Sequence, residues 1–197
     1  MTMRKKLLIT IACLSVILCT LVTGTIAWLI ADTDPIENKF TPSNISISLT
    51  ETKKDFKMVP GTTFKKDPVV TVAPNSEACY LFVQINENLG AWDAPGKAFT
   101  DYLTYTVAAG WESLNGYVGV YYRTVSTSGN QQDFHVLADD QVTVGPSVTK
   151  GMMDMLYNQD GSVKEAVLPT LTFTAYACQQ EGFSSAAAAW TEITTNP

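Results

Sequence analysis

The sequence contains little of the chemistry that most enzymes use. Among 197 residues there is one histidine, His135. A zinc protease site of the His-Glu-x-x-His type needs two histidines, so that class is excluded. A Ser-His-Asp triad needs only one, but no Gly-x-Ser-x-Gly elbow supports it, and the scattered glycines form no phosphate-binding loop. We therefore expect a protein that is not an enzyme and has no catalytic residue, with His135 as a structural residue on a strand.

Metal ligands are also scarce. Cys79 and Cys178 are too few for a thiolate zinc site. The pairs Asp139–Asp140 and Asp154–Asp160 can offer carboxylates to Ca²⁺, but their spacing does not match an EF-hand, and solvated turn acids are the alternative. We expect no metal and no cofactor.

Basic residues are outnumbered. The first 27 residues contain three of the 13 Lys and Arg residues and none of the 19 Asp and Glu residues. The rest of the chain therefore has 10 basic and 19 acidic residues and a net charge of −9. Such a domain has no electrostatic reason to bind nucleic acid or anionic lipid. Its charge favours solubility, or cations and basic partners.

The longest apolar run is in the first 40 residues. A basic start at Arg4, Lys5 and Lys6 precedes 25 uncharged residues, 7–31, which is long enough to cross a bilayer as a helix. Small residues at Thr25 and Ala27 fit the −3 and −1 positions of a cut before Trp28. The run predicts either a cleaved signal peptide, residues 1–27, or a retained anchor. Both place the remaining chain outside the cytoplasm, with membrane contact in the first case only before cleavage.

Two cysteines remain after such a cut. Cys13 and Cys19 lie in the leader, whereas Cys79 and Cys178 lie in strand-like segments. Outside the cell these two can oxidise, and a disulfide is expected if their strands are neighbours. Two separate buried thiols are the alternative.

The rest of the chain reads as strands. Clean alternation of apolar and polar residues marks 44–50, 78–86 and 169–180 as the strongest ones. Nine or ten short strands separated by turns indicate an all-β antiparallel sandwich or barrel. Short helices are expected at 147–157 and 186–191, the second capped by serine and rich in alanine. We expect one β-sandwich domain, residues 43–197, after an irregular arm, residues 28–42.

One stretch resembles a known family. Gly24-Thr25-Ile26-Ala27-Trp28, an acidic patch, Asn38-Lys39-Phe40 and an alternating strand that ends at Glu51 are similar to the leader of the TasA/camelysin family. The resemblance is specific over residues 20–51. It implies a secreted biofilm-matrix fibre protein of Gram-positive bacteria, with a jelly-roll sandwich. It also implies a SipW-dependent leader, a dedicated signal peptidase, and a location in the extracellular matrix or at the cell surface.

The same resemblance implies how the protein assembles. Cleavage would free the arm 28–42, whose apolar residues would enter a groove in another copy or in a related matrix subunit. An added strand supplies main-chain hydrogen bonds, and a head-to-tail contact that does not close makes a filament. Pro35, which lacks an N–H, limits pairing at its own position. The apolar arm residues are Trp28, Leu29, Ile30, Ile36 and Phe40.

Two other functions stay open. A secreted or membrane-anchored adhesin can use loop aromatics such as Trp92, Trp111, Tyr121 and Tyr122 to bind a glycan, although core packing also explains these residues. A secreted hydrolase is the weaker alternative, because the catalytic patterns are missing.

Overall fold

The computed structural model describes Met3, Lys5, Leu8, Ile11, residues 44–52 and residues 56–195. The chain divides into two units, Met1–Thr41 and Pro42–Pro197. The four described residues of the first unit are helical, and no helix among the described residues is both long and apolar enough to span a membrane. The predicted cleavage site and the predicted arm lie outside the described residues: Thr25, Ala27, Trp28, Leu29, Ile30, Ile36 and Phe40.

The second unit is all-β, as the alternation predicts, with two short helices. Every strand pair is antiparallel. The strands are β1 (Ile47–Thr50), β2 (Thr63–Lys65), β3 (Val69–Val72), β4 (Cys79–Asn88), β5 (Leu103–Thr104), β6 (Glu112–Ser113), β7 (Val120–Val125), β8 (Gln132–His135), β9 (Gln141–Val144) and β10 (Thr170–Gln179). The helices are α2 (Lys150–Asp154) and α3 (Ala186–Thr195), with 3₁₀ turns at Gly90–Trp92, Phe99–Asp101, Ala138–Asp140 and Glu165–Val167.

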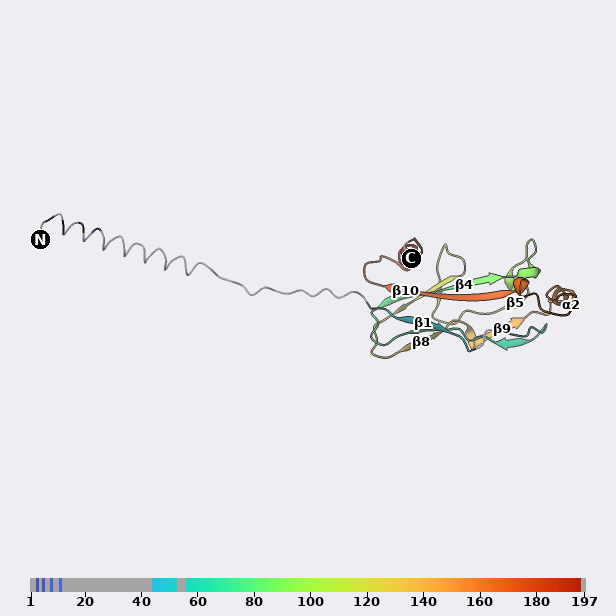
Figure 1. Cartoon of the computed structure of the whole chain (residues 1–197). Coiled ribbons are helices and arrows are strands. Elements are labelled where there is room, and N and C mark those ends of the chain that lie inside the picture. Colours follow the sequence, from blue (N-terminus) through green and yellow to red (C-terminus); the bar gives the residue numbers. More distant parts are fainter. Residues whose placement is uncertain are drawn as a thin grey trace. The chain divides into compact units, whose positions relative to one another are not determined.

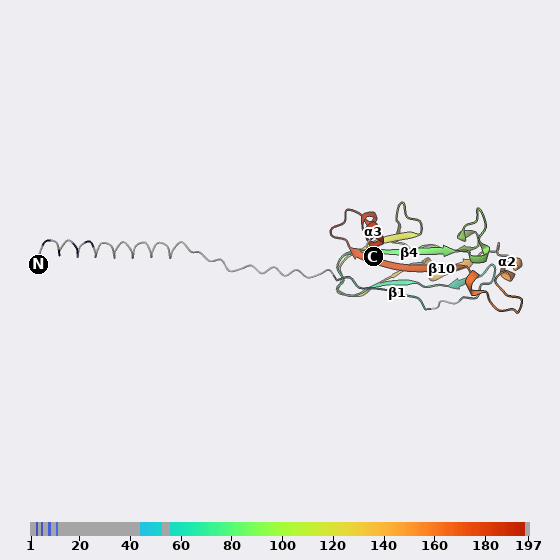
Figure 2. The same ribbon diagram turned by 45° about the horizontal axis from the view of Figure 1, so that its top comes forward.

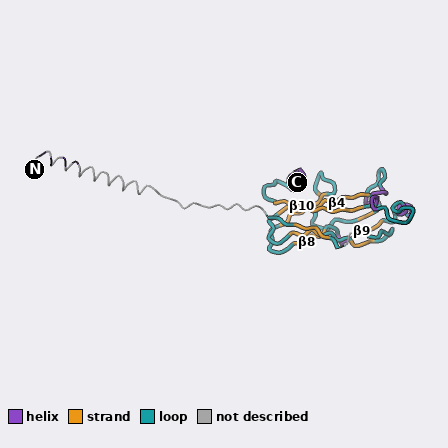
Figure 3. Tube along the Cα trace, in the orientation of Figure 1, coloured by secondary structure: helices purple, strands orange, loops and turns teal. Residues whose placement is uncertain are grey.

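The strands form two layers. One layer is the sheet β10-β4-β7-β6. The other combines the sheets β1-β3-β8 and β2-β9-β5. Backbone hydrogen bonds from Lys66 to Asp140 and from Val136 to Pro68 continue the pairing across the gap between these two small sheets. The layers face each other in Figures 1 and 2, and the helical segments lie at their periphery (Figure 3).

The two central strands of this sheet, β4 and β7, contribute one face to each of two hydrophobic cores. Leu81 and Val83 of β4 are fully buried between the layers, in the main core. Phe82, on the opposite face of β4, is also fully buried because α3 covers the outside of the sheet. Trp190 of α3 packs on Phe82 with ring centroids 5.2 Å apart. Both faces of this strand are therefore covered.

The turns limit two local elements. β6 and β7 pair on either side of Asn115–Gly116, but six residues intervene between the two strands, and Leu114 donates its N–H to the carbonyl of Val120. The loop needs Gly119 at φ +73°, where an added Cβ would lie 2.5 Å from the carbonyl oxygen of Ile85. The helix expected over 147–157 is limited to the five residues of α2.

Candidate functional site

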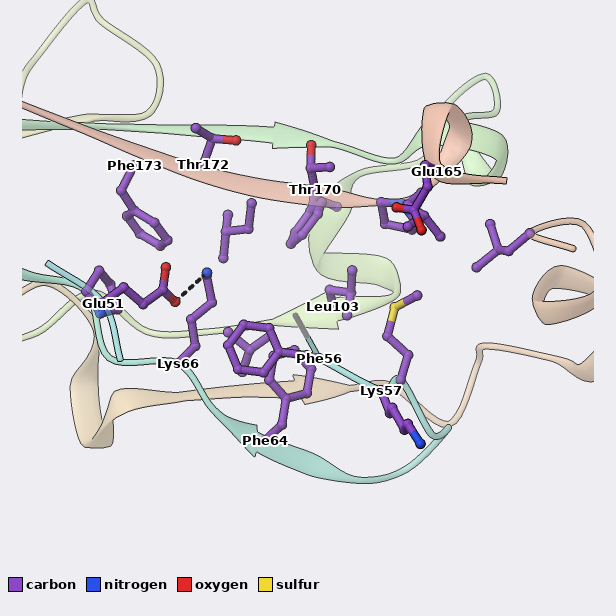
Figure 4. Close-up of a pocket in the computed structure, with 18 of the residues that line it drawn as sticks. Glu51, Phe56, Lys57, Phe64, Lys66, Leu103, Glu165, Thr170, Thr172 and Phe173 are labelled. Atoms are coloured by element: carbon purple, nitrogen blue, oxygen red, sulfur yellow. Dashed lines mark hydrogen bonds and ion pairs between the residues drawn. The ribbon is translucent and has the colours of Figure 1, made fainter. Parts of the chain in front are cut away.

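An open groove lies between the layers, along the edge of β10. Its volume is about 1030 Å³, at the upper end of the range for ligand pockets. β10 forms one wall, and the end of β1 with the segment that leads to β2 forms the other, as Figure 4 shows. The apolar lining includes Leu49, Phe56, Phe64, Leu103, Leu171 and Phe173.

The backbone edge of β10 faces this groove without a strand partner. Gln180 donates its N–H to Ala78, so the even-numbered residues of β10 bond to β4. The N–H and C=O groups of the odd-numbered residues, such as Leu171 and Phe173, therefore point away from β4. No strand among the described residues pairs with that edge. An unpaired edge beside apolar walls can accept an additional strand.

The edge of β1 on the opposite wall has the same arrangement. Ala73 donates its N–H to the carbonyl of Ser46, so the even-numbered residues of β1 bond to β3. The backbone groups of Ile47 and Leu49 then point away from β3, and β1 is also an edge strand in the described part of the chain. Where Leu49 and Thr50 line the groove, the strand edges on both walls therefore have no strand partner in the described part of the chain.

One ion pair lies inside the groove. Lys66 Nζ donates to Glu51 Oε1 at 2.7 Å, and their side chains are 8% and 14% exposed. The ammonium group also lies 5.2 Å from the ring centroids of Phe56 and Phe173. Figure 4 shows the pair between the two walls. The carboxylate uses Oε1 in this pair, and no hydrogen bond between described residues uses its second acceptor, Oε2.

A second polar contact fixes the same wall. The carboxylate of Asp67 accepts hydrogen bonds from the backbone N–H and the hydroxyl of Thr52 and forms an ion pair with Lys65 at 3.0 Å. The hydroxyl bond from Thr52, followed by the bond from Lys65 and then the backbone bond from Thr52, lowers the pKa of Asp67 to about 2. These contacts join residues 51–52 to residues 65–67, so they hold the start and the end of the segment that carries Phe56 and Phe64.

We expect Asp67→Asn to lower the urea midpoint of unfolding at pH 7. The contacts that lower the pKa of Asp67 stabilise the fold at pH values above the unfolded-state pKa of about 4. This contribution is lost as the pH falls through the folded-state pKa of about 2. The difference between Asp67→Asn and the unaltered chain should therefore shrink between pH 4 and pH 2. Asp154→Asn, which removes an exposed pair with Lys150, is the matched control and should change little. A difference that is independent of pH would contradict the assignment.

The opposite side of the sandwich is filled by side chains. Trp111 donates its indole N–H to the carbonyl of His135 at 2.8 Å. The guanidinium of Arg123 lies 4.0 Å from the ring centroid of Phe134 and 5.4 Å from that of Trp111. Burial lowers the pKa of Arg123. This side carries large side chains and an exposed His135, whereas the β10 side is hollow.

The expected disulfide is not formed in the structure. The two strands are neighbours, as the prediction required, but Cys178 pairs with Tyr80 and Cys79 with Gln179. Adjacent register positions alternate between faces, so Cys79 lies in the main core and Cys178 packs under α3. Both are free thiols. Burial raises the pKa of Cys79 to about 11 and also raises that of Cys178.

The aromatic residues considered for glycan binding are explained by packing. Trp92 and Trp111 are 3% and 8% exposed. The indole N–H of Trp92 donates to the carbonyl of Met152. Tyr121 packs against the main core, and the hydroxyl of Tyr122 donates to Glu112. These residues therefore form no shared exposed face.

The acidic candidates are spread over separate contacts. Asp140 lies 2.8 Å from Nδ1 of His135, which is 56% exposed. Asp154 pairs with Lys150, and Asp160 accepts from Ser162. Within 44–52 and 56–195 no three metal-ligating side chains converge.

Sequence reasoning missed Glu51 and Lys66 as site residues. Their burial depends on a contact across 15 positions of sequence, which no local pattern reports. The sequence offers a partial signal that Lys66 is turned inward. Side chains two positions apart on a strand share a face, so Lys66 lies on the face of Phe64 if the strand continues.

Comparison of the chain with protein-family models, with curated proteins and with solved structures finds no significant match in any of the three.

Proposed function

We propose that this chain is a secreted structural protein of the TasA/camelysin type, a subunit of extracellular or biofilm-matrix fibres. After cleavage before Trp28, the arm 28–42 of one copy would enter the groove beside β10 of another copy or of a related subunit. The observation that carries the proposal is the pair of unpaired strand edges, β10 and β1, on either side of an apolar groove. Strand addition satisfies the backbone and covers the apolar walls at once.

Exposed apolar side chains support the same site. In the described part of the second unit, large apolar residues with more than two fifths of their surface exposed are few. Three of them, Val59, Tyr157 and Val163, line the groove, and Met155 follows α2 near them in sequence. Contiguous exposed apolar surface marks an interaction site. The arm offers matching apolar residues at alternate positions, Trp28, Ile30 and Ile36 among them.

We further propose that the sandwich is a jelly roll. Strands early in the chain pair with strands late in the chain: β3 with β8, β2 with β9, and β4 with β10. This pairing is what rolling up a long hairpin produces, and a jelly roll has eight strands from two Greek keys. A complete roll would also pair the first strand with the last. In this chain β1 and β10 are the two edges beside the groove.

The proposal predicts a contact between two copies that can be mapped. Phe40 would be replaced by a photoreactive benzoylphenylalanine in an isotopically heavy chain that begins at Trp28, and mixed with an unlabelled chain. We expect electron microscopy to show fibres, and mass spectrometry to show cross-links from heavy arms to light residues of the groove. The same probe at Val118, which is 100% exposed and outside the groove, is the matched control.

Three outcomes would count against the proposal. Cross-links within one copy would indicate that the arm fills its own groove. Cross-links to another surface would place the contact elsewhere. A chain beginning at Trp28 that forms no fibre at any concentration or pH would favour a monomeric adhesin.

A further inference from the structure

The groove is open at one end and closed at the other. The Cα atoms of β1 and β10 come within 8 Å of each other. Of the two strands only Leu49, Thr50 and residues 170–173 line the groove, so it ends at the level of Leu49 and Phe173. A strand placed between two others separates them by two strand spacings, about 9.6 Å. No strand can therefore pass between β1 and β10 at that end. The small side chains of Ala175 and Ala177 on β10 permit the close approach.

The edges diverge toward α2, where the groove is wide and its rim is apolar. Tyr157 and Val163 are paired across a turn there and are 44% and 41% exposed. An inserted segment can leave the groove at this end. At the other end it must stop.

This asymmetry fixes which end of a donated segment lies at the closed end. In the assembly proposed above, on which this inference rests, the segment has one free terminus, Trp28, and one end that continues through Phe40 into its own domain. The continuing end needs an exit, so it lies toward α2. The free terminus therefore lies at the closed end, beside Phe173, Glu51 and Lys66.

A free terminus carries a group that the closed end can recognise. The α-amino group created by cleavage is a cation with three donors near neutral pH. Glu51 offers Oε2, which no hydrogen bond between described residues uses, whereas Lys66 keeps Oε1 and the faces of Phe56 and Phe173. A carboxylate in a site that is 14% exposed has lost most of its water and gains from a second charged donor.

We infer that the closed end of the groove is a receptor for a free chain N-terminus, in which Glu51 accepts the α-ammonium group of Trp28 from a second copy. An uncleaved chain has an amide at this position and no charge to offer. Signal cleavage then does more than release the arm, because it creates the group that the next subunit binds.

Two synthetic peptides test the inference. Both comprise residues 28–41 with an amidated C-terminus, and one is acetylated at Trp28. Each is titrated as an inhibitor of fibre growth by the chain that begins at Trp28. We expect the free peptide to inhibit at a concentration about tenfold or more below that of the acetylated one, the usual advantage of a charged hydrogen bond.

Variants of the receptor assign the effect to Glu51. Glu51→Gln should weaken the free peptide about tenfold and remove the difference between the peptides. Because Glu51→Gln leaves Lys66 without its anion, the double variant Glu51→Gln/Lys66→Met is also used and should not discriminate either. Glu165→Gln, an exposed acid that lines the groove near its open end, is the matched control and should retain the full difference.

The outcomes separate this inference from the function on which it rests. Equal inhibition by both peptides would overturn the N-terminal receptor and leave strand donation standing. Retained discrimination in Glu51→Gln and in the double variant would overturn the role of Glu51. Inhibition by neither peptide would overturn strand donation itself, and the inference with it.

Discussion

A chain that begins at residue 43 should fold as a monomer and form no fibres. Both hydrophobic cores are built from residues between Ile45 and Ile193, so deletion of 28–42 removes none of their members. Circular dichroism should remain β-rich, and the urea midpoint should stay close to that of the monomeric full-length chain at low concentration. The groove would be left with two open edges and no donor.

Adding the arm back as a peptide should show what was lost. A peptide of residues 28–41 should bind the truncated domain, measured by calorimetry, and raise its melting temperature in proportion to peptide concentration. Replacing Trp28, Ile30, Ile36 or Phe40 by serine should weaken binding more than replacing Asp32 or Asp34, because apolar burial supplies most of the affinity in such a groove. Fibres formed equally well by the truncated chain would refute donation by the arm.

The main strands of this fold were predictable because each shows a local alternation of apolar and polar residues. Alternation over 78–86 and 169–180 located β4 and β10 to within a few residues. The serine at 185 predicted the start of α3, and its hydroxyl accepts the N–H of Ala188 as expected for a cap. The helix extends to Thr195, beyond the predicted end, and Ile193 in the added turn packs against the second hydrophobic core.

Register was not predictable, and the cysteines show why. Alternation assigned Cys79 and Cys178 to strands, but a shift of one residue moves a side chain to the other face. That register depends on the complete packing of β4 against β10, which are separated by some 80 residues of sequence. The strands that carry the two cysteines are neighbours, which was the condition for the disulfide, but their register places the two thiols on opposite faces.

The groove itself was hidden for a related reason. It exists because β1 and β10 do not pair, and a missing contact between distant strands leaves no mark in either segment. The residues that give it its chemistry, Glu51 and Lys66, are a charged pair that only the completed fold buries.

Removing one member of that pair should have the largest effect on stability of any single change in the groove. Lys66→Met leaves Glu51 as an unpaired carboxylate that is 14% exposed, and breaking a buried pair costs about 3–5 kcal/mol. The remaining exposure places the expected cost near the lower end, about 3 kcal/mol. For a domain of this size the melting temperature should fall by roughly 6–12 °C.

The double variant Glu51→Gln/Lys66→Met should recover most of that loss, because replacing both partners of a buried pair is often nearly neutral. Scanning calorimetry of the four chains gives the coupling between the two positions. A coupling near zero would mean that water in the open groove screens the pair, and the pair would then not be the dry closed end described above. A large coupling together with a stable double variant would mean that the pair is dry and that the fold does not need its charges. The charges would then serve to bind the segment that enters the groove. A double variant that is stable but does not distinguish a free from an acetylated N-terminus would separate this binding role from folding.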